Sequence, residues 1–170
     1  MEKINIRKMA LTGVLMALVI LSIFFVKIPI PSGLGYIHIA DSFILLSALL
    51  GPGYAFAAGG VGGMLADILA GYGAYAPWTL AVHGLQGLLM AILLPRMKKA
   101  DARMFFILGL AISAATVVPG YYLAEVIMYG SWSTPLLGLP LNLIQVAAGS
   151  ALGALLYLPS LKIFRNRQGE

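Results

Sequence analysis

Apolar residues occur in long runs along this chain, separated by short segments rich in glycine, proline and charged residues. The runs at 9–26, 77–94 and 102–129 are each long enough to cross the hydrocarbon core of a bilayer, which takes about 20 helical residues. The run at 39–50 would make only about 18 Å of helix, so we expect it to be a buried or partial span. Helices at 53–70 and within 136–164 complete a predicted all-α bundle of six transmembrane helices.

Helix-breaking residues place the loops between these runs. The sequence KIPIPSGLG, which starts at Lys27, contains two prolines and two glycines and predicts a loop at 27–38. Further loops are expected at 71–76 and 130–135, where glycines follow apolar runs. Pro119 and Gly120 lie inside the run at 102–129 and predict a kink in that helix.

The stretch from Gly51 to Gly87 concentrates glycines within apolar sequence. A helix that faces lipid has no need of them, because acyl chains pack equally well against leucine. Glycines serve where another backbone or a ligand must approach closely. This stretch therefore predicts the interior of the bundle.

The composition supports a membrane location. The chain is 61% hydrophobic and 10% charged, with a mean hydropathy of +0.95, whereas soluble domains have about 45–50% apolar and about 25% charged residues. Its 170 residues form a single predicted transmembrane domain with no room for a soluble catalytic domain, so we do not expect an enzyme. The absence of cysteine excludes disulfides and thiolate chemistry. No cofactor, metal ion or nucleic-acid partner is expected.

The basic residues predict the orientation in the membrane. Lys27 lies at the opposite ends of the helices from the other ten of the eleven lysines and arginines. By the positive-inside rule both termini are cytoplasmic, and the loops at 27–38, 71–76 and 130–135 face outward. The ten are Lys3, Arg7, Lys8, Arg96, Lys98, Lys99, Arg103, Lys162, Arg165 and Arg167.

In this orientation the intramembrane polar residues fall in the outer half of the bilayer. An ionised carboxylate in hydrocarbon costs about 2.5–3.5 kcal/mol on insertion scales, so such groups pair or line a wet cavity. Helical spacing brings them onto shared faces of the helices. We therefore predict a polar pocket that opens outward, with candidate solute contacts at Tyr36, His38, Trp78, His83, Gln86, Tyr121, Tyr122, Glu125, Asn142 and Gln145.

Other roles are open for several polar residues. Asp41 and Asp67 stand near helix ends, where capping or pairing is favoured over solute contact. Tyr72, Tyr75 and Trp132 have the positions of an interfacial aromatic belt. His83 has an alternative role as a packing residue that bonds across the bundle.

The residues resemble those of a known family, the substrate-binding S components of energy-coupling factor (ECF) vitamin transporters, in the riboflavin-type sequence group. The likeness covers essentially the whole chain. It rests on Asp41, Gly51-Pro52, Gly59-Gly60, Ala66-Asp67, Gly71-Tyr72, Tyr75-Ala76-Pro77, and Gly84 with Gly87.

The resemblance implies a subunit of the cytoplasmic membrane of a prokaryote that captures a vitamin from outside. It also implies partners, a transmembrane T component and two cytoplasmic ATPases, and the chain has no phosphate-binding GxxxxGK[ST] loop of its own. In the family the solute site is built from the first loop and helices four to six. The first helix usually carries a small-residue docking motif, for which Gly13 and Ala17, with Ala10 nearby, have the spacing. Packing within the bundle is the alternative role for these residues.

The solute is expected to be a small polar heteroaromatic vitamin. An acid, a histidine and amides suit pyridoxine or hydroxymethylpyrimidine, a thiamine precursor, and riboflavin is the alternative. A stand-alone secondary transporter is a further alternative, because intramembrane acids also carry ions. An intramembrane hydrolase using Ser150 and His83 is disfavoured, because no acid is placed to orient the histidine.

Overall fold

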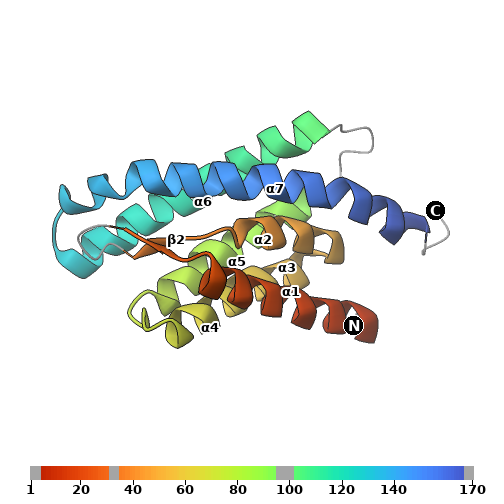
Figure 1. The fold of residues 1–170 in the computed structure, drawn as a ribbon, viewed down its shortest axis with the longest axis horizontal. Coiled ribbons are helices and arrows are strands. Elements are labelled where there is room, and N and C mark those ends of the chain that lie inside the picture. The colour runs from red at the N-terminus through yellow and green to blue at the C-terminus, as the bar shows by residue number, and fades with distance from the viewer. Residues whose placement is uncertain (1–4, 31–34, 95–101, 167–170) are drawn as a thin grey trace.

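The computed structural model describes residues 5–30, 35–94 and 102–166, and it is almost entirely helical. The long helices run side by side along one axis of the molecule (Figure 1). They are α1 (Ile6–Phe25), α5 (Ala76–Leu93), α6 (Ala102–Tyr129) and α7 (Leu139–Asn166), and each is long and apolar enough to cross a membrane. The shorter elements are β1 (Ile28–Pro29), β2 (Tyr36–Ile37), α2 (Asp41–Ser47) with a 3-10 turn (Ala48–Leu50), α3 (Pro52–Phe56), a π-helical turn (Ala57–Val61), α4 (Gly62–Leu69) and a 3-10 turn (Thr134–Leu137).

The helical segments follow the predicted runs closely. Residues 52–69 form one continuous helical segment made of α3, the π turn and α4, where the sequence predicted a helix at 53–70. α6 continues through Pro119. The sequence did not predict that the loop after α1 forms a small antiparallel hairpin, in which Pro29 pairs with Tyr36. This hairpin directs β2 back over the interior of the bundle.

Glycines allow the segment 52–69 to touch α5 along its backbone. A Cβ on Gly59 would lie 2.5 Å from the carbonyl oxygen of His83, and a Cβ on Gly60 would lie 2.7 Å from that of Leu80. From the other side, a Cβ on Gly87 would overlap the carbonyl oxygen of Ala55. Any side chain here would force two backbones apart, which explains these three glycines and confirms the interior position of this part of the stretch, whereas Gly53, Gly71 and Gly73 are exposed.

The short helix α2 is buried between its longer neighbours. Ile44, Leu45 and Asp41 are fully buried. α7 approaches α2 through Gly149, where a Cβ would lie 2.5 Å from the Cβ of Asp41. The prediction that the 12-residue run makes a buried helix is therefore confirmed, and α2 brings its first residue into the centre of the bundle.

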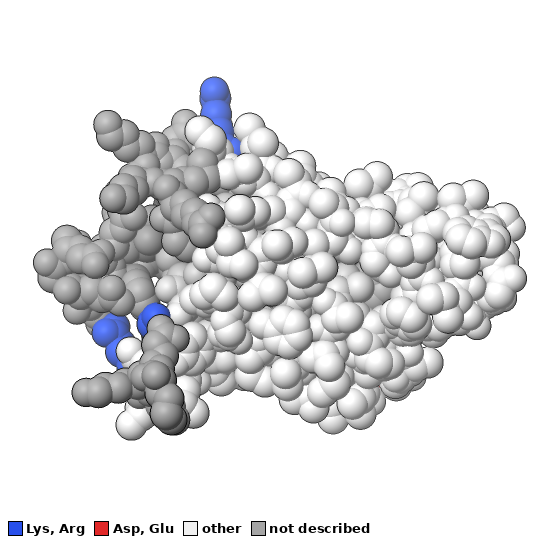
Figure 2. Space-filling model, turned by 180° about the vertical axis from the view of Figure 1, so that it is seen from behind, with Lys and Arg blue, Asp and Glu red and all other residues white. Residues whose placement is uncertain are grey.

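The first residues of α1 and the last residues of α7 lie at the same end of the molecule (Figure 1). In the reverse view, the lysines and arginines in sight gather at that end, and the rest of this face shows no charged residue (Figure 2). Arg7 and Lys8 open α1, and Arg103 opens α6. Five of the counted basic residues lie outside the described residues, namely Lys3, Arg96, Lys98, Lys99 and Arg167.

Candidate functional site

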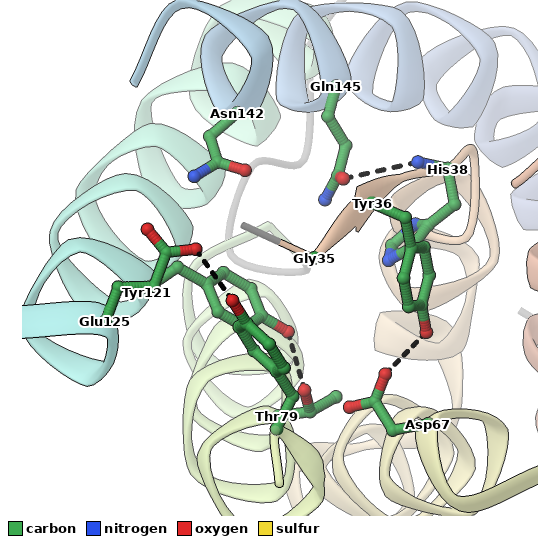
Figure 3. A pocket seen from close by; sticks show the side chains of 10 residues that line it. Gly35, Tyr36, His38, Asp67, Thr79, Tyr121, Glu125, Asn142 and Gln145 are labelled. Atoms are coloured by element: carbon green, nitrogen blue, oxygen red, sulfur yellow. Dashed lines mark hydrogen bonds between the residues drawn. The ribbon is translucent and has the colours of Figure 1, made fainter. Parts of the chain in front are cut away.

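A pocket lies in the half of the bundle away from the termini. It encloses about 20 Å³, and side chains from β2, α4, α5, α6 and α7 point into it (Figure 3). Its lining residues are Gly35, Tyr36, His38, Asp67, Tyr75, Thr79, Tyr121, Glu125, Asn142 and Gln145.

Asp67 supplies a carboxylate from the last turn of α4. Its Oδ1 accepts a hydrogen bond of 2.5 Å from the hydroxyl of Tyr36, whereas its buried Oδ2 has no hydrogen-bond partner. Burial, together with the nearby Asp67 carboxyl, raises the pKa of Tyr36 above its usual range, so the phenol keeps its proton and donates. The hairpin thus fixes one oxygen of Asp67 and leaves the other available.

Glu125 supplies a second carboxylate from α6, on another side of the pocket (Figure 3). Its Oε1 accepts a long hydrogen bond of 3.3 Å from the hydroxyl of Tyr75, and its buried Oε2 has no hydrogen-bond partner. Burial and the hydrogen bond to Tyr129 raise the pKa of Tyr75, which therefore stays protonated. A buried acceptor left unpaired costs about 1–3 kcal/mol, and more when charged, so both free oxygens favour a solute that donates hydrogen bonds.

Asn142 and Gln145 point into the pocket from the first turns of α7 (Figure 3). The side-chain oxygen of Gln145 accepts from the backbone N–H of His38 at 3.3 Å, and its Nε2 donates to Asp41 at 3.1 Å. One N–H of the Gln145 amide remains, and the Asn142 amide faces the pocket as well. These amides complement the acids across the cavity.

His38 contributes a neutral ring. Burial lowers the pKa of His38 to about 4, outweighing the attraction of Asp41, so the imidazole is uncharged at neutral pH. Its Nδ1 accepts from the backbone N–H of Ala40 at 3.2 Å. The ring proton therefore lies on Nε2, which is a hydrogen-bond donor.

Behind the pocket, Asp41 is the centre of a buried polar network. Its carboxylate accepts from Gln86 Nε2 at 2.6 Å and from Gln145 Nε2 at 3.1 Å. Gln86 Nε2 also donates to Ser113, and Gln86 Oε1 lies 2.6 Å from Nδ1 of His83. Because that oxygen can only accept, the proton of His83 lies on Nδ1. Asp41 thus binds Gln145, which lines the pocket, through one carboxylate oxygen. Through the other oxygen it binds Gln86, which is paired with His83 on α5.

Aromatic rings form much of the remaining wall. The Tyr121 hydroxyl lies 2.8 Å from Oγ1 of Thr79, and its ring centroid is 5.7 Å from that of His83. Tyr36 and Tyr72 meet edge to face at 4.7 Å, and the Lys27 ammonium lies over both rings. Such rings offer faces and edges on which a flat solute can pack.

Most of the residues predicted to contact a solute are brought together here. Tyr36, His38, Tyr121, Glu125, Asn142 and Gln145 line the pocket. His83 and Gln86 are buried one layer behind it. Trp78 does not line it, and the Tyr122 hydroxyl bonds instead to the backbone oxygen of Trp132 at 3.0 Å.

Four lining residues were not among the predicted contacts, namely Gly35, Asp67, Tyr75 and Thr79. Asp67 was expected to cap or pair, and Tyr75 was expected to belong to an interfacial belt. Asp41 was expected to cap or pair; it is the first residue of α2, and its side chain accepts hydrogen bonds from two amides.

The small residues of α1 lie away from this site. Ala10, Gly13 and Ala17 are all exposed, and a Cβ on Gly13 would meet no atom within 4 Å. The alternative that Gly13 packs within the bundle is therefore not supported.

Comparison with known proteins places the chain in a family. The family described as "ECF-type riboflavin transporter, S component" matches residues 3–162. The thiamine precursor transporter HmpT of Lactococcus lactis subsp. cremoris (strain MG1363) is 32% identical over 158 residues, which cover 92% of this chain and 89% of HmpT. An uncharacterized protein of Pyrococcus woesei is 35% identical over 106 residues, covering 62% of this chain and 69% of that protein. The chain belongs to the S components of ECF-type transporters.

Proposed function

We propose that this chain captures hydroxymethylpyrimidine at the outer face of the membrane for ATP-driven uptake. The observation that carries the proposal is the pair of buried carboxylates, Asp67 and Glu125, each with a free oxygen at one pocket that also holds amide donors. The 32% identity to a thiamine precursor transporter over nearly the whole chain supports the same solute.

The chemistry of the solute matches this arrangement of donors and acceptors. Hydroxymethylpyrimidine carries an amino group and a hydroxyl, which donate, and ring nitrogens, which accept. The donors suit the free oxygens of Asp67 and Glu125, and the ring nitrogens suit His38 Nε2 and the α7 amides. Pyridoxine has hydroxyl donors but no amino group, so it matches the two acids less completely.

The size of the pocket also favours a small solute over riboflavin. A cavity of about 20 Å³ accommodates roughly one water molecule, so any ring must displace part of the wall. A single pyrimidine ring requires a smaller displacement than the three fused rings of riboflavin. Riboflavin remains the alternative solute because the matching family description names it.

Calorimetric titration of the purified protein with each candidate tests the solute. Each lost donor–acceptor pair costs about 1–3 kcal/mol, or roughly tenfold to hundredfold in affinity. We therefore expect hydroxymethylpyrimidine to bind at least tenfold more tightly than pyridoxine or riboflavin. Mass spectrometry of solute retained during purification provides an independent check. Tighter binding of riboflavin would contradict the proposed solute.

We propose that the exposed small residues of α1 dock on a transmembrane T component, which two cytoplasmic ATPases drive. Helix association in lipid has no hydrophobic driving force, and small residues permit the close backbone contact on which it depends. Ala10, Gly13 and Ala17 offer such a surface outside the bundle. Uptake into proteoliposomes should then require these partners and ATP, whereas a stand-alone transporter would accumulate solute without them.

We also propose that six helices span the cytoplasmic membrane of a prokaryote with both termini inside. The described basic residues gather at the end where α1 begins and α7 ends, which supports this orientation (Figure 2). It puts the pocket toward the outer surface. The two relatives, from a Lactococcus and a Pyrococcus, support a prokaryotic membrane.

Single cysteines report this orientation cleanly because the chain has none of its own. We expect Gly73→Cys and Ser133→Cys, in the loops before α5 and α7, to react with an impermeant maleimide in intact cells. Ser160→Cys, near the end of α7, should react only after the membrane is opened. The reverse pattern would overturn the orientation and with it an outward-facing pocket.

A further inference from the structure

The pocket brings two buried acids together. Asp67 and Glu125 are both buried, and no described lysine or arginine lines the cavity. Lys27 contacts a lining residue, but its ammonium lies over the rings of Tyr36 and Tyr72 rather than beside either acid. A neutral solute between two ionised carboxylates would leave both buried charges without a counter-charge, an arrangement that protein interiors avoid.

The two acids differ in how well their surroundings hold the ionised form. Asp67 receives a 2.5 Å hydrogen bond from Tyr36. Glu125 receives one hydrogen bond of 3.3 Å, from Tyr75. Gly138 lies next to its free Oε2, since a Cβ there would be 3.6 Å from that oxygen, and glycine has no side chain that could donate to it. Glu125 is therefore the carboxylate with more need of a charged partner from the solute.

Among the described residues, the other groups that face Glu125 and Asp67 include no lysine or arginine. Tyr75, Tyr129 and Tyr121 stand on the α5 and α6 sides, and Asn142 faces them from α7. Tyr36 and Thr79 flank Asp67. His38, with its pKa lowered to about 4, is neutral. Behind them, Asp41 is held by two amides, and His83 donates to Gln86.

We infer that Glu125 and the bound solute share one proton taken up from solvent, an inference that rests on the proposed function. A 4-aminopyrimidine accepts a proton on a ring nitrogen, and the charged ring then presents N–H groups to a carboxylate. In the complex this proton lies between the ring nitrogen and a Glu125 oxygen. Glu125 thus selects solutes whose ring nitrogen is basic, a property that the flavin ring of riboflavin lacks.

Linkage fixes the sign of the pH dependence. If the complex holds one proton more than the free protein and free solute together, affinity falls as pH rises. In the range where both free partners are deprotonated, the loss is about tenfold for each pH unit.

The experiment is calorimetric titration with hydroxymethylpyrimidine between pH 6.5 and about 9, in buffers of differing ionisation enthalpy. Glu125→Gln keeps the shape of the side chain but removes the charge, and Asp67→Asn is the matched control at the other acid. We expect the parent and Asp67→Asn to lose about tenfold in affinity per unit at the alkaline end and to take up about one proton. Glu125→Gln should bind with an affinity that changes less than twofold per unit.

Three outcomes overturn the inference separately from the proposed function. They are pH-independent binding by the parent, a slope that persists in Glu125→Gln, and a slope that disappears in Asp67→Asn. If the folded parent, checked by its melting temperature, does not bind hydroxymethylpyrimidine at any pH, the proposed function fails and the inference fails with it.

Discussion

The Gly13→Leu substitution is expected to abolish ATP-driven uptake and to leave solute binding unchanged. Gly13 lies on an exposed face of α1, and its Cβ position is free of contacts for 4 Å, so leucine fits the isolated subunit. Leucine is also a better helix former than glycine. The substitution would instead hold a partner helix away from α1, because close backbone approach drives association in lipid.

The measurements are copurification with the T component, uptake into proteoliposomes, and calorimetric titration of the isolated subunit. Ala17→Leu should behave in the same way. Val14→Leu is the matched control, because Val14 is exposed on the same helix, is already a large residue and lies about 100° around the helix from Gly13. Normal copurification of both Gly13→Leu and Ala17→Leu would show that the partner docks elsewhere.

Substitution of Asp41, which does not line the pocket, is expected to lower both the solute affinity and the melting temperature. Asp41→Ala removes the acceptor of two side-chain amides, those of Gln86 and Gln145, in a fully buried position. Leaving such groups unsatisfied costs about 1–3 kcal/mol each. The melting temperature should fall, and affinity should weaken about tenfold to hundredfold, because Gln145 loses the contact that orients its amide toward the solute.

Ser42→Ala separates this effect from simple disturbance of α2. Ser42 is equally buried, but its hydroxyl bonds only to the backbone oxygen of Ile39 within the same turn. We expect Ser42→Ala to change affinity less than threefold, and Asp41→Asn to fall between the two variants. Parent-like affinity in Asp41→Ala would mean that the network behind the pocket does not position Gln145.

The sequence predicted the helices well because their signal is local. Apolar length and helix-breaking residues set the ends of each run, and the shortness of the run at 39–50 correctly indicated burial. The hairpin of β1 and β2 carries no such signal, since each strand has two residues. It forms because the chain returns over the bundle, which is a tertiary effect.

The site was harder to predict, because neighbouring residues of one helix point in different directions. Tyr121 and Tyr122 were both expected in the pocket, but successive residues are about 100° apart around a helix, and Tyr122 bonds to the loop at Trp132. Asp67 gave the opposite problem. Its place at a helix end suggested a cap, and only the hairpin that brings Tyr36 to it identifies it as a pocket residue.

The backbone contacts between the segment 52–69 and α5 also bear on how a solute enters. Gly59 and Gly87 bring two main chains into direct contact, so we expect this half of the subunit to move as one unit. Asp67 and Thr79 belong to that unit and keep their separation. The hairpin, α6 and α7 must therefore move outward to admit a ring into so small a cavity. Opening becomes a conformational step of its own, and it sets an upper limit on the association rate at high solute concentration.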